Sequence, residues 1–269
     1  MQHESPEPIR KSDLLAGFAR LTEDDASELD AALLLARVID EHLDAEQTRA
    51  QVLKLAEAAR ADGVDDVKAL LAFLEGQGFG QGALTEVDLT HSSIDWLLQQ
   101  HQALPIVVAV LVIAMARGLG MQAAGVNYPG HFLLEVNDQL IDPIGLCVVR
   151  RDSLPRPEGV PTDELFSNAN AMMIAFRMLN NLKAYNLRLQ NWRGMLAVSD
   201  YQVALAHAEP NLLGMVHFER GEYSQQLGES DAALEEYTRC IEMCERDALV
   251  EKAKARVQLL LAEHQGALH

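Results

Sequence analysis

The stretch from Ala103 to Ala116 is the longest apolar run in the chain, and it constrains the fold more than any other feature. It is shorter than the roughly 20 residues that a membrane-spanning helix needs, so it suits a buried position in a folded core. Its valines and isoleucines leave a buried strand as the alternative. Pro105 suits a first helical turn, and Gly118-Leu119-Gly120 suits a helix end. The run therefore predicts a central helix from residue 105 to about residue 117.

A small antiparallel sheet is predicted directly after this helix. Segments 131–136 and 139–142 are apolar or alternating, as half-buried strands are. Asn137 and Asp138 between them favour a tight two-residue turn. Together with a strand over residues 121–127, the hairpin predicts a sheet that packs against the central helix.

The predicted hairpin brings an imidazole and a carboxylate together. A two-residue turn pairs Asp142 with Leu133, which puts His131 and Asp142 diagonally on one face of the sheet. A carboxylate that orients a histidine is the base half of a nucleophilic triad. No cysteine stands where such a triad needs its nucleophile. We therefore interpret the pair as a remnant catalytic dyad, with a histidine kept for structural reasons as the alternative.

The acidic composition limits the classes of partner. The chain of 269 residues has a formal net charge of −18 and an isoelectric point near 4.8. Such a surface repels nucleic-acid phosphates and anionic lipids, so we expect neither nucleic acid nor a membrane as partner. The first residues lack the features of a signal peptide. Three cysteines, an odd number, favour a reduced compartment, so we expect a cytoplasmic protein.

The N-terminal part is predicted to be helical and to bind no nucleotide. Residues 12–75 keep helical spacing, with Thr22 and Asp44 placed as helix N-caps. The glycine-rich segment 76–82 follows, but it lacks the Lys-Ser/Thr pair of a phosphate loop. We interpret this segment as a connection.

The C-terminal part is also predicted to be helical from residue 163 onward. Residues 215–243 resemble a tetratricopeptide unit, with a looser copy upstream. Cys240 and Cys244 fall one helical turn apart, but no matching His or Cys pair lies nearby, so they are interpreted as packing residues. We predict an α+β, mostly helical fold with domains 1–160 and 161–269, no cofactor and no metal ion.

Four segments within residues 90–145 carry a family resemblance. Ala-Leu-Pro-Ile-Val-Val at 103–108 precedes Gly-Leu-Gly at 118–120, Gly-Val-Asn-Tyr-Pro-Gly-His-Phe-Leu at 125–133 and Ile-Asp-Pro at 141–143. This pattern resembles the SirB-type proteins, a transglutaminase-like family with a helical or tetratricopeptide C-terminal part. The resemblance implies a papain/transglutaminase-like core, in which the N-terminus of a central helix presents a nucleophile to a histidine and an aspartate on adjacent strands.

The resemblance also implies a place for the nucleophile. Active transglutaminases have a cysteine at the start of the central helix, whereas Val107 stands where SirB-type proteins commonly have Ser or Thr. Valine has no proton to lose and no lone pair to attack with. We therefore predict a catalytically silent regulatory module that binds a protein or peptide partner, for which basic residues would suit the acidic surface. The identity of the partner and the oligomeric state stay open.

Two other interpretations remain. The chain is a hydrolase or acyltransferase if Cys147 or Ser93 serves as a non-standard nucleophile beside His131 and Asp142. Alternatively, it is a structural interaction domain whose sheet pocket has no role. The candidates for lining a pocket near the histidine are Val107, Asn127, Tyr128 and Ser93.

Overall fold

The computed structural model describes residues 7–23, 25–80, 82, 84, 86–156 and 165–266. The chain divides into two compact units. Unit 1 comprises Met1–Leu14 with Glu23–Met178, and unit 2 comprises Leu15–Thr22 with Leu179–His269. The domain boundary expected after residue 160 stays a prediction.

The N-terminal helices follow the predicted pattern, with one wrong cap. Asp44 accepts a hydrogen bond from the backbone N–H of Gln47 at 2.9 Å, as expected for an N-cap. The N-cap predicted at Thr22 is wrong, because its hydroxyl donates back to the carbonyl of Ala19 and Ser27 caps the next helix instead. The helices that precede the central one are α1 (Lys11–Arg20), α2 (Glu28–Ile39), α3 (Ala45–Ala61), α4 (Val67–Gly76) and α5 (Ile94–Gln100), with a 3-10 turn η1 (Thr90–Ser92) before α5.

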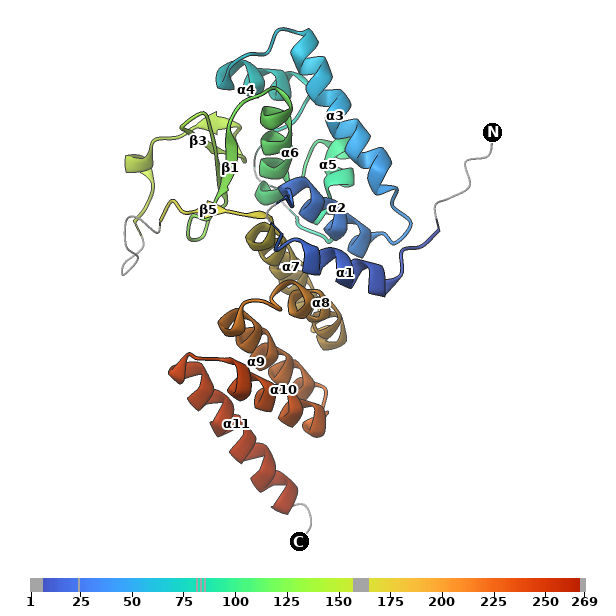
Figure 1. Ribbon diagram of the computed structural model, residues 1–269, viewed down its shortest axis with the longest axis vertical. Helices are drawn as coiled ribbons and strands as arrows, with labels where there is room; N and C mark the ends of the chain where they lie inside the picture. Colours follow the sequence, from blue (N-terminus) through green and yellow to red (C-terminus); the bar gives the residue numbers. More distant parts are fainter. Residues whose placement is uncertain are drawn as a thin grey trace. The chain divides into compact units, whose positions relative to one another are not determined.

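The predicted central helix is α6 (Pro105–Gly118), and the strand alternative for this segment is wrong. Its residues are buried all round, from Ile106 through Ala116 with the exception of Ala114. A helix that is apolar on every side needs cover on every side. Helices α2, α3 and α5 cover one side and the sheet covers the other (Figure 1).

The sheet is antiparallel, with strands in the order β4-β3-β2-β1-β5. The turn at Asn137 and Asp138 has φ angles of 45° and 63°, which are typical of a type I′ hairpin. Leu134 pairs with Ile141, so the register predicted for the hairpin is confirmed. The strands are β1 (Ala123–Val126), β2 (Leu133–Val136), β3 (Gln139–Asp142), β4 (Cys147–Val148) and β5 (Asn168–Ala169), with a second 3-10 turn η2 (Arg151–Ser153).

An ion pair with a buried carboxylate joins α2, α6 and the first strand. Arg117 near the end of α6 donates to both carboxylate oxygens of Glu28, which is 5% exposed. The same guanidinium donates to the carbonyl of Ala123 at 2.8 Å and 3.0 Å. Bidentate pairing of this kind fixes orientation as well as distance. It holds α6 in register with the sheet.

Unit 2 is built from consecutive packed helices. The helical pattern expected from residue 163 begins later, because Asn168 and Ala169 form β5. Helix α8 packs on α9, α9 on α10, and α10 on α11. The buried cysteines Cys240 and Cys244 lie in the apolar cluster of these helices, as predicted. The helices are α7 (Ala171–Arg188), which enters the unit at Leu179, α8 (Trp192–Leu205), α9 (Pro210–Gln226), α10 (Ser230–Met243) and α11 (Asp247–Gly266).

A network of charged side chains links three of these helices. His217 Nδ1 lies 2.6 Å from a carboxylate oxygen of Glu236, and both residues are buried. Arg220 donates to the other oxygen of Glu236 at 2.8 Å and to Asp200 at 2.7 Å. Burial alone would raise the pKa of Glu236, but the hydrogen bonds from His217 and Arg220 and the charge of Arg220 outweigh it and hold this pKa below its ordinary value.

Within the part of the chain that the structure describes, no single helix has both the length and the apolarity to cross a membrane. The pair formed by α5 and α6 meets both criteria together, but it is bent by 85° at the break between the helices.

Candidate functional site

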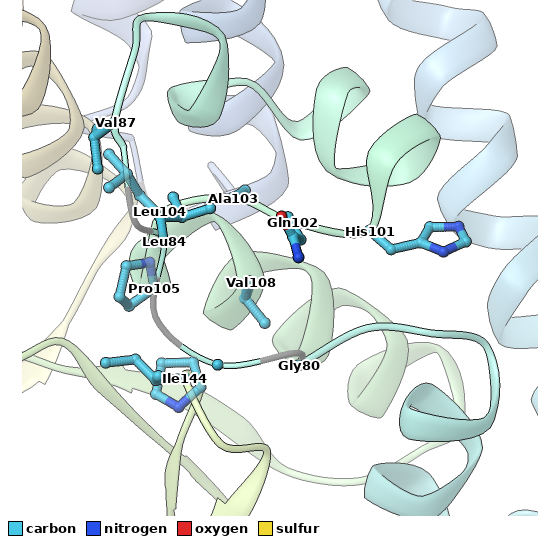
Figure 2. Close-up of a pocket in the computed structure, with 12 residues that line it drawn as sticks. Gly80, Leu84, Val87, His101, Gln102, Ala103, Leu104, Pro105, Val108 and Ile144 are labelled. Atoms are coloured by element: carbon cyan, nitrogen blue, oxygen red, sulfur yellow. The ribbon is translucent and has the colours of Figure 1, made fainter.

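A cavity of about 190 Å³ lies at the N-terminal end of α6 (Figure 2). Ala103, Leu104, Pro105 and Val108 form the wall on the side of the helix. His101 and Gln102 line it from the connection between α5 and α6. The other walls come from the loop before η1 and from the turn between β3 and β4, with the lining residues Gly80, Gly82, Leu84, Val87, Pro143 and Ile144. The site therefore brings together three segments that lie far apart in sequence.

Local hydrogen bonds and close packing fix these walls. A carboxylate oxygen of Asp142 accepts the backbone N–H of Ile144 at 2.9 Å, which forms an Asx turn and directs Pro143 and Ile144 to the cavity. Gly80 has a φ of 77°, and a Cβ there would lie 2.5 Å from the side chain of Leu146. Only glycine lets the loop approach the β3–β4 turn so closely.

His101 and Gln102 are the polar side chains among the described residues of the lining. His101 ends α5 with a φ of 61°, and its ring packs 4.6 Å from that of Phe79. Figure 2 shows this ring directed away from the aliphatic side chains of the lining, whereas Gln102 lies between them. Gln102 is exposed, so its amide is available at the edge of the cavity.

His131 lies outside strand β2, so the strand predicted over residues 131–136 begins two residues too early. Strand β2 begins at Leu133, because Gly130 turns the backbone with a φ of 77° and the N–H of His131 donates to the carbonyl of Tyr128 at 3.3 Å. The side chain of His131 is exposed, and it makes no hydrogen bond to any residue in the described ranges. Asp142 directs one oxygen to its own turn instead. The role of this pair as a remnant dyad stays a prediction.

Val107 and Ser93 are buried away from the cavity. Val107 is 0% exposed, and its neighbour Val108 lines the cavity in its place. Ser93 is 6% exposed and stands at the N-cap of α5, but its hydroxyl accepts no bond from that helix. Neither residue presents an atom to the cavity in this structure.

Asn127 and the carbonyl of Tyr128 accept hydrogen bonds from Arg177, a half-buried residue of α7. Asn127 accepts a hydrogen bond from Arg177 at 2.5 Å, and the hydroxyl of Tyr128 donates to the carbonyl of Pro155. The guanidinium of Arg177 also lies 5.4 Å from the ring centroid of Phe132. Burial lowers the pKa of Arg177. These contacts shape the loop that carries His131, and neither Asn127 nor Tyr128 lines the cavity.

Cys147 is the one candidate nucleophile on the surface of the sheet. It is exposed on β4, and it is the direct cross-strand partner of Asp142. Side chains of directly paired residues point to the same face of a sheet. The thiol of Cys147 and the carboxylate of Asp142 therefore lie on the same face of the sheet.

No local sequence signal marks Leu84, Val87, Gln102 and Ile144 as site residues. Their segments are loops and turns, and only tertiary packing brings them to the end of α6. Across the described residues, no group of three or more His, Cys, Asp or Glu side chains is placed to hold a metal ion.

A buried helix whose N-terminus meets an antiparallel sheet is the core arrangement of papain-like and transglutaminase-like proteins. The chain belongs to the transglutaminase-like superfamily, whose family model matches residues 26–180.

Three relatives are each named as a UPF0162 protein. The one from Vibrio cholerae is 26% identical over 265 residues, covering 91% of this chain and 97% of the relative. One from Xylella fastidiosa is 26% identical over 191 residues, or 64% and 68% of the two chains. One from Pseudomonas aeruginosa is 31% identical over 134 residues, or 46% and 48%. No solved structure matches the chain.

Proposed function

We propose that this protein is a catalytically silent member of its superfamily, of the SirB type, that binds a protein or peptide partner in the cytoplasm. One observation carries the proposal. Among the described residues that line the cavity at the N-terminal end of α6, none has a sulfur or a hydroxyl oxygen, and the buried Val107 stands where the resemblance places the nucleophile. Acyl transfer through a covalent intermediate needs such an atom within reach of a base.

The helical unit supports the binding role. A Cβ on Gly221 of α9 would lie 2.5 Å from the ring of Tyr237 on α10, so these helices cross at close approach. Such contact between a small residue and an aromatic ring favours a tetratricopeptide-like arrangement for α9 and α10. Repeats of this kind present extended surfaces to partners. We propose that these helices contribute to partner binding.

One observation favours a second candidate function. Cys147 is exposed and paired with Asp142, so a thiol-dependent hydrolase or acyltransferase would use this residue. Such an enzyme needs a thiolate at neutral pH, and hence a base beside the sulfur. His131 is the imidazole that the sequence offers for that task.

Labelling with iodoacetamide across pH separates the two functions. In a silent protein, Cys147 reacts at the rate of an ordinary exposed thiol, and His131→Ala leaves its pH profile unchanged. Cys240 reacts more slowly, because burial, followed by the neighbouring Cys244, raises the pKa of its thiol to about 11. Mass spectrometry of the intact protein and of its peptides assigns each rate. Rapid labelling of Cys147 near pH 7 that His131→Ala slows would establish the enzyme instead.

Ser93 is tested in the same way with a fluorophosphonate probe. Its hydroxyl is buried, so we expect no labelling of the folded protein. Stoichiometric labelling at Ser93 that is lost in Ser93→Ala would refute the silent reading by a different route.

A further inference from the structure

The cavity at the N-terminal end of α6 has a mostly apolar lining in a highly charged protein. Lys, Arg, Asp and Glu make up 23% of the chain, yet none of them is among the described residues that line the cavity. Leu84, Leu104, Val108 and Ile144 supply aliphatic surface from several sides. A charged group placed here would lose its hydration without gaining a counter-ion. The lining therefore selects an uncharged, apolar group.

The volume sets the size of that group. At about 190 Å³ the cavity is slightly larger than the engineered apolar cavity of about 150 Å³ that binds benzene in another protein. It is smaller than the roughly 300–1,000 Å³ of typical sites for drug-sized ligands and cofactors. A branched aliphatic or a phenyl group fits, whereas a nucleotide or a long acyl chain does not.

Gln102 adds a polar partner at the edge of this apolar space. Its exposed side-chain amide both donates and accepts hydrogen bonds, as a peptide group does. Pro105, by contrast, has no backbone N–H to offer. An occupant that places an apolar group inside the cavity and an amide beside Gln102 satisfies both features. A peptide residue with an apolar side chain has this chemistry.

We propose that the cavity binds one leucine- or phenylalanine-sized side chain of a peptide partner, and that Gln102 hydrogen-bonds the peptide group next to it. The proposal rests on the proposed function for the kind of partner, but the site is defined by its own geometry. Recognition by a single buried anchor with a polar rim is a common way of binding peptides.

The test uses methyl-labelled intact protein and four small probes. The N-acetyl methylamides of leucine and phenylalanine should give saturable shifts of the Val108 and Ile144 methyl signals. The corresponding derivatives of glycine and aspartate should give none. Absence of saturable shifts with both apolar derivatives, or equal shifts with the aspartate derivative, overturns the proposal.

A matched pair of variants locates the binding. Ala103→Leu, just before α6, fills the cavity and should weaken binding of the leucine derivative at least tenfold. Ala114→Leu on α6 lies outside the lining and should leave this binding unchanged. Ile144→Phe fills the cavity from the opposite wall and replaces Ala103→Leu if that variant fails to fold. Binding that survives in the filled variant overturns the proposal.

Two further measurements separate the peptide anchor from other outcomes. Gln102→Ala should weaken binding of the leucine derivative but leave binding of benzene unchanged. If benzene binds but the leucine and phenylalanine derivatives do not, the occupant is a small apolar molecule and the peptide proposal is wrong. The same titrations on Cys147→Ala distinguish this proposal from the proposed function. Fast labelling of Cys147 that depends on His131 would refute the silent function, even if the cavity still binds the leucine derivative. Absence of cavity binding without such labelling would refute only the peptide-binding proposal.

Discussion

Replacing Asp142 distinguishes a turn-forming carboxylate from one that orients a histidine. The carboxylate accepts one hydrogen bond, from the backbone N–H of Ile144 at 2.9 Å, and the residue is half-buried. Buried hydrogen bonds to charged groups contribute about 1.5–3 kcal/mol, and partial exposure reduces this to about 1 kcal/mol here. Asp142→Ala should therefore reduce the stability of the turn by about 1 kcal/mol. Asp142→Asn should reduce it by less than half as much, because asparagine also forms Asx turns.

The assay is hydrogen exchange at single residues, since a chain of two units gives no single unfolding equilibrium. A loss of about 1 kcal/mol raises the exchange rate of the Ile144 amide about fivefold in Asp142→Ala. The ¹⁵N shifts of the His131 imidazole should stay the same in both variants. The reasoning is refuted if the imidazole shifts change while the exchange of Ile144 does not, because Asp142 would then act on the histidine and not on the turn.

Three other substitutions test the packing and the charges. Val107→Cys places a thiol at a position that is 0% exposed, so this thiol should react with iodoacetamide more slowly than the exposed Cys147. The variant should also show no acyl transfer, and the kinetics of intact-mass changes would measure both. Gly221→Ala should destabilise unit 2 by about 1–3 kcal/mol in thermal unfolding, because the added methyl group would clash with the ring of Tyr237. In the control Gly76→Ala, the added methyl group has no neighbour within 4 Å, so this variant should be neutral. The pKa of Glu236 is lowered in the folded protein, so its contribution to stability is present above about pH 4.5 and is lost as the pH falls through that lowered pKa. Glu236→Gln should therefore weaken the dependence of stability on pH in the acid range, as denaturation followed by circular dichroism would measure. An unchanged pH dependence would contradict a stabilising role for the network of His217, Arg220 and Glu236.

The elements predicted well are those that local chemistry determines. Helix α6 follows from an apolar run with proline at its start and glycines at its end. The hairpin register follows from the turn residues Asn137 and Asp138, which adopt the positive φ angles that a type I′ turn requires. Asp44 caps α3 because its short carboxylate reaches the N–H three residues on.

The elements that were missed depend on partners far away in sequence. Strands β4 and β5 have two residues each, which is too short for any periodicity, and they exist because β3 and β1 offer free edges. The start of α2 was misplaced because Thr22 and Ser27 have similar local signals, and only Ser27 forms the reciprocal pair with Asp30. The cavity was missed for the same reason, since its walls meet only after the chain has folded.

A family motif can have structural roles in a fold besides the reaction that it serves elsewhere. Asp142 in the Ile-Asp-Pro segment forms an Asx turn, and that turn places Pro143 and Ile144 on the wall of the cavity. The Pro-Gly-His-Phe segment turns the chain at Gly130 and sets Phe132 against the guanidinium of Arg177. Both motifs therefore have structural roles in this chain that do not depend on a nucleophile. Their presence agrees with the transglutaminase-like fold, whereas the proposed silent function depends on the aliphatic residues at the N-terminal end of α6.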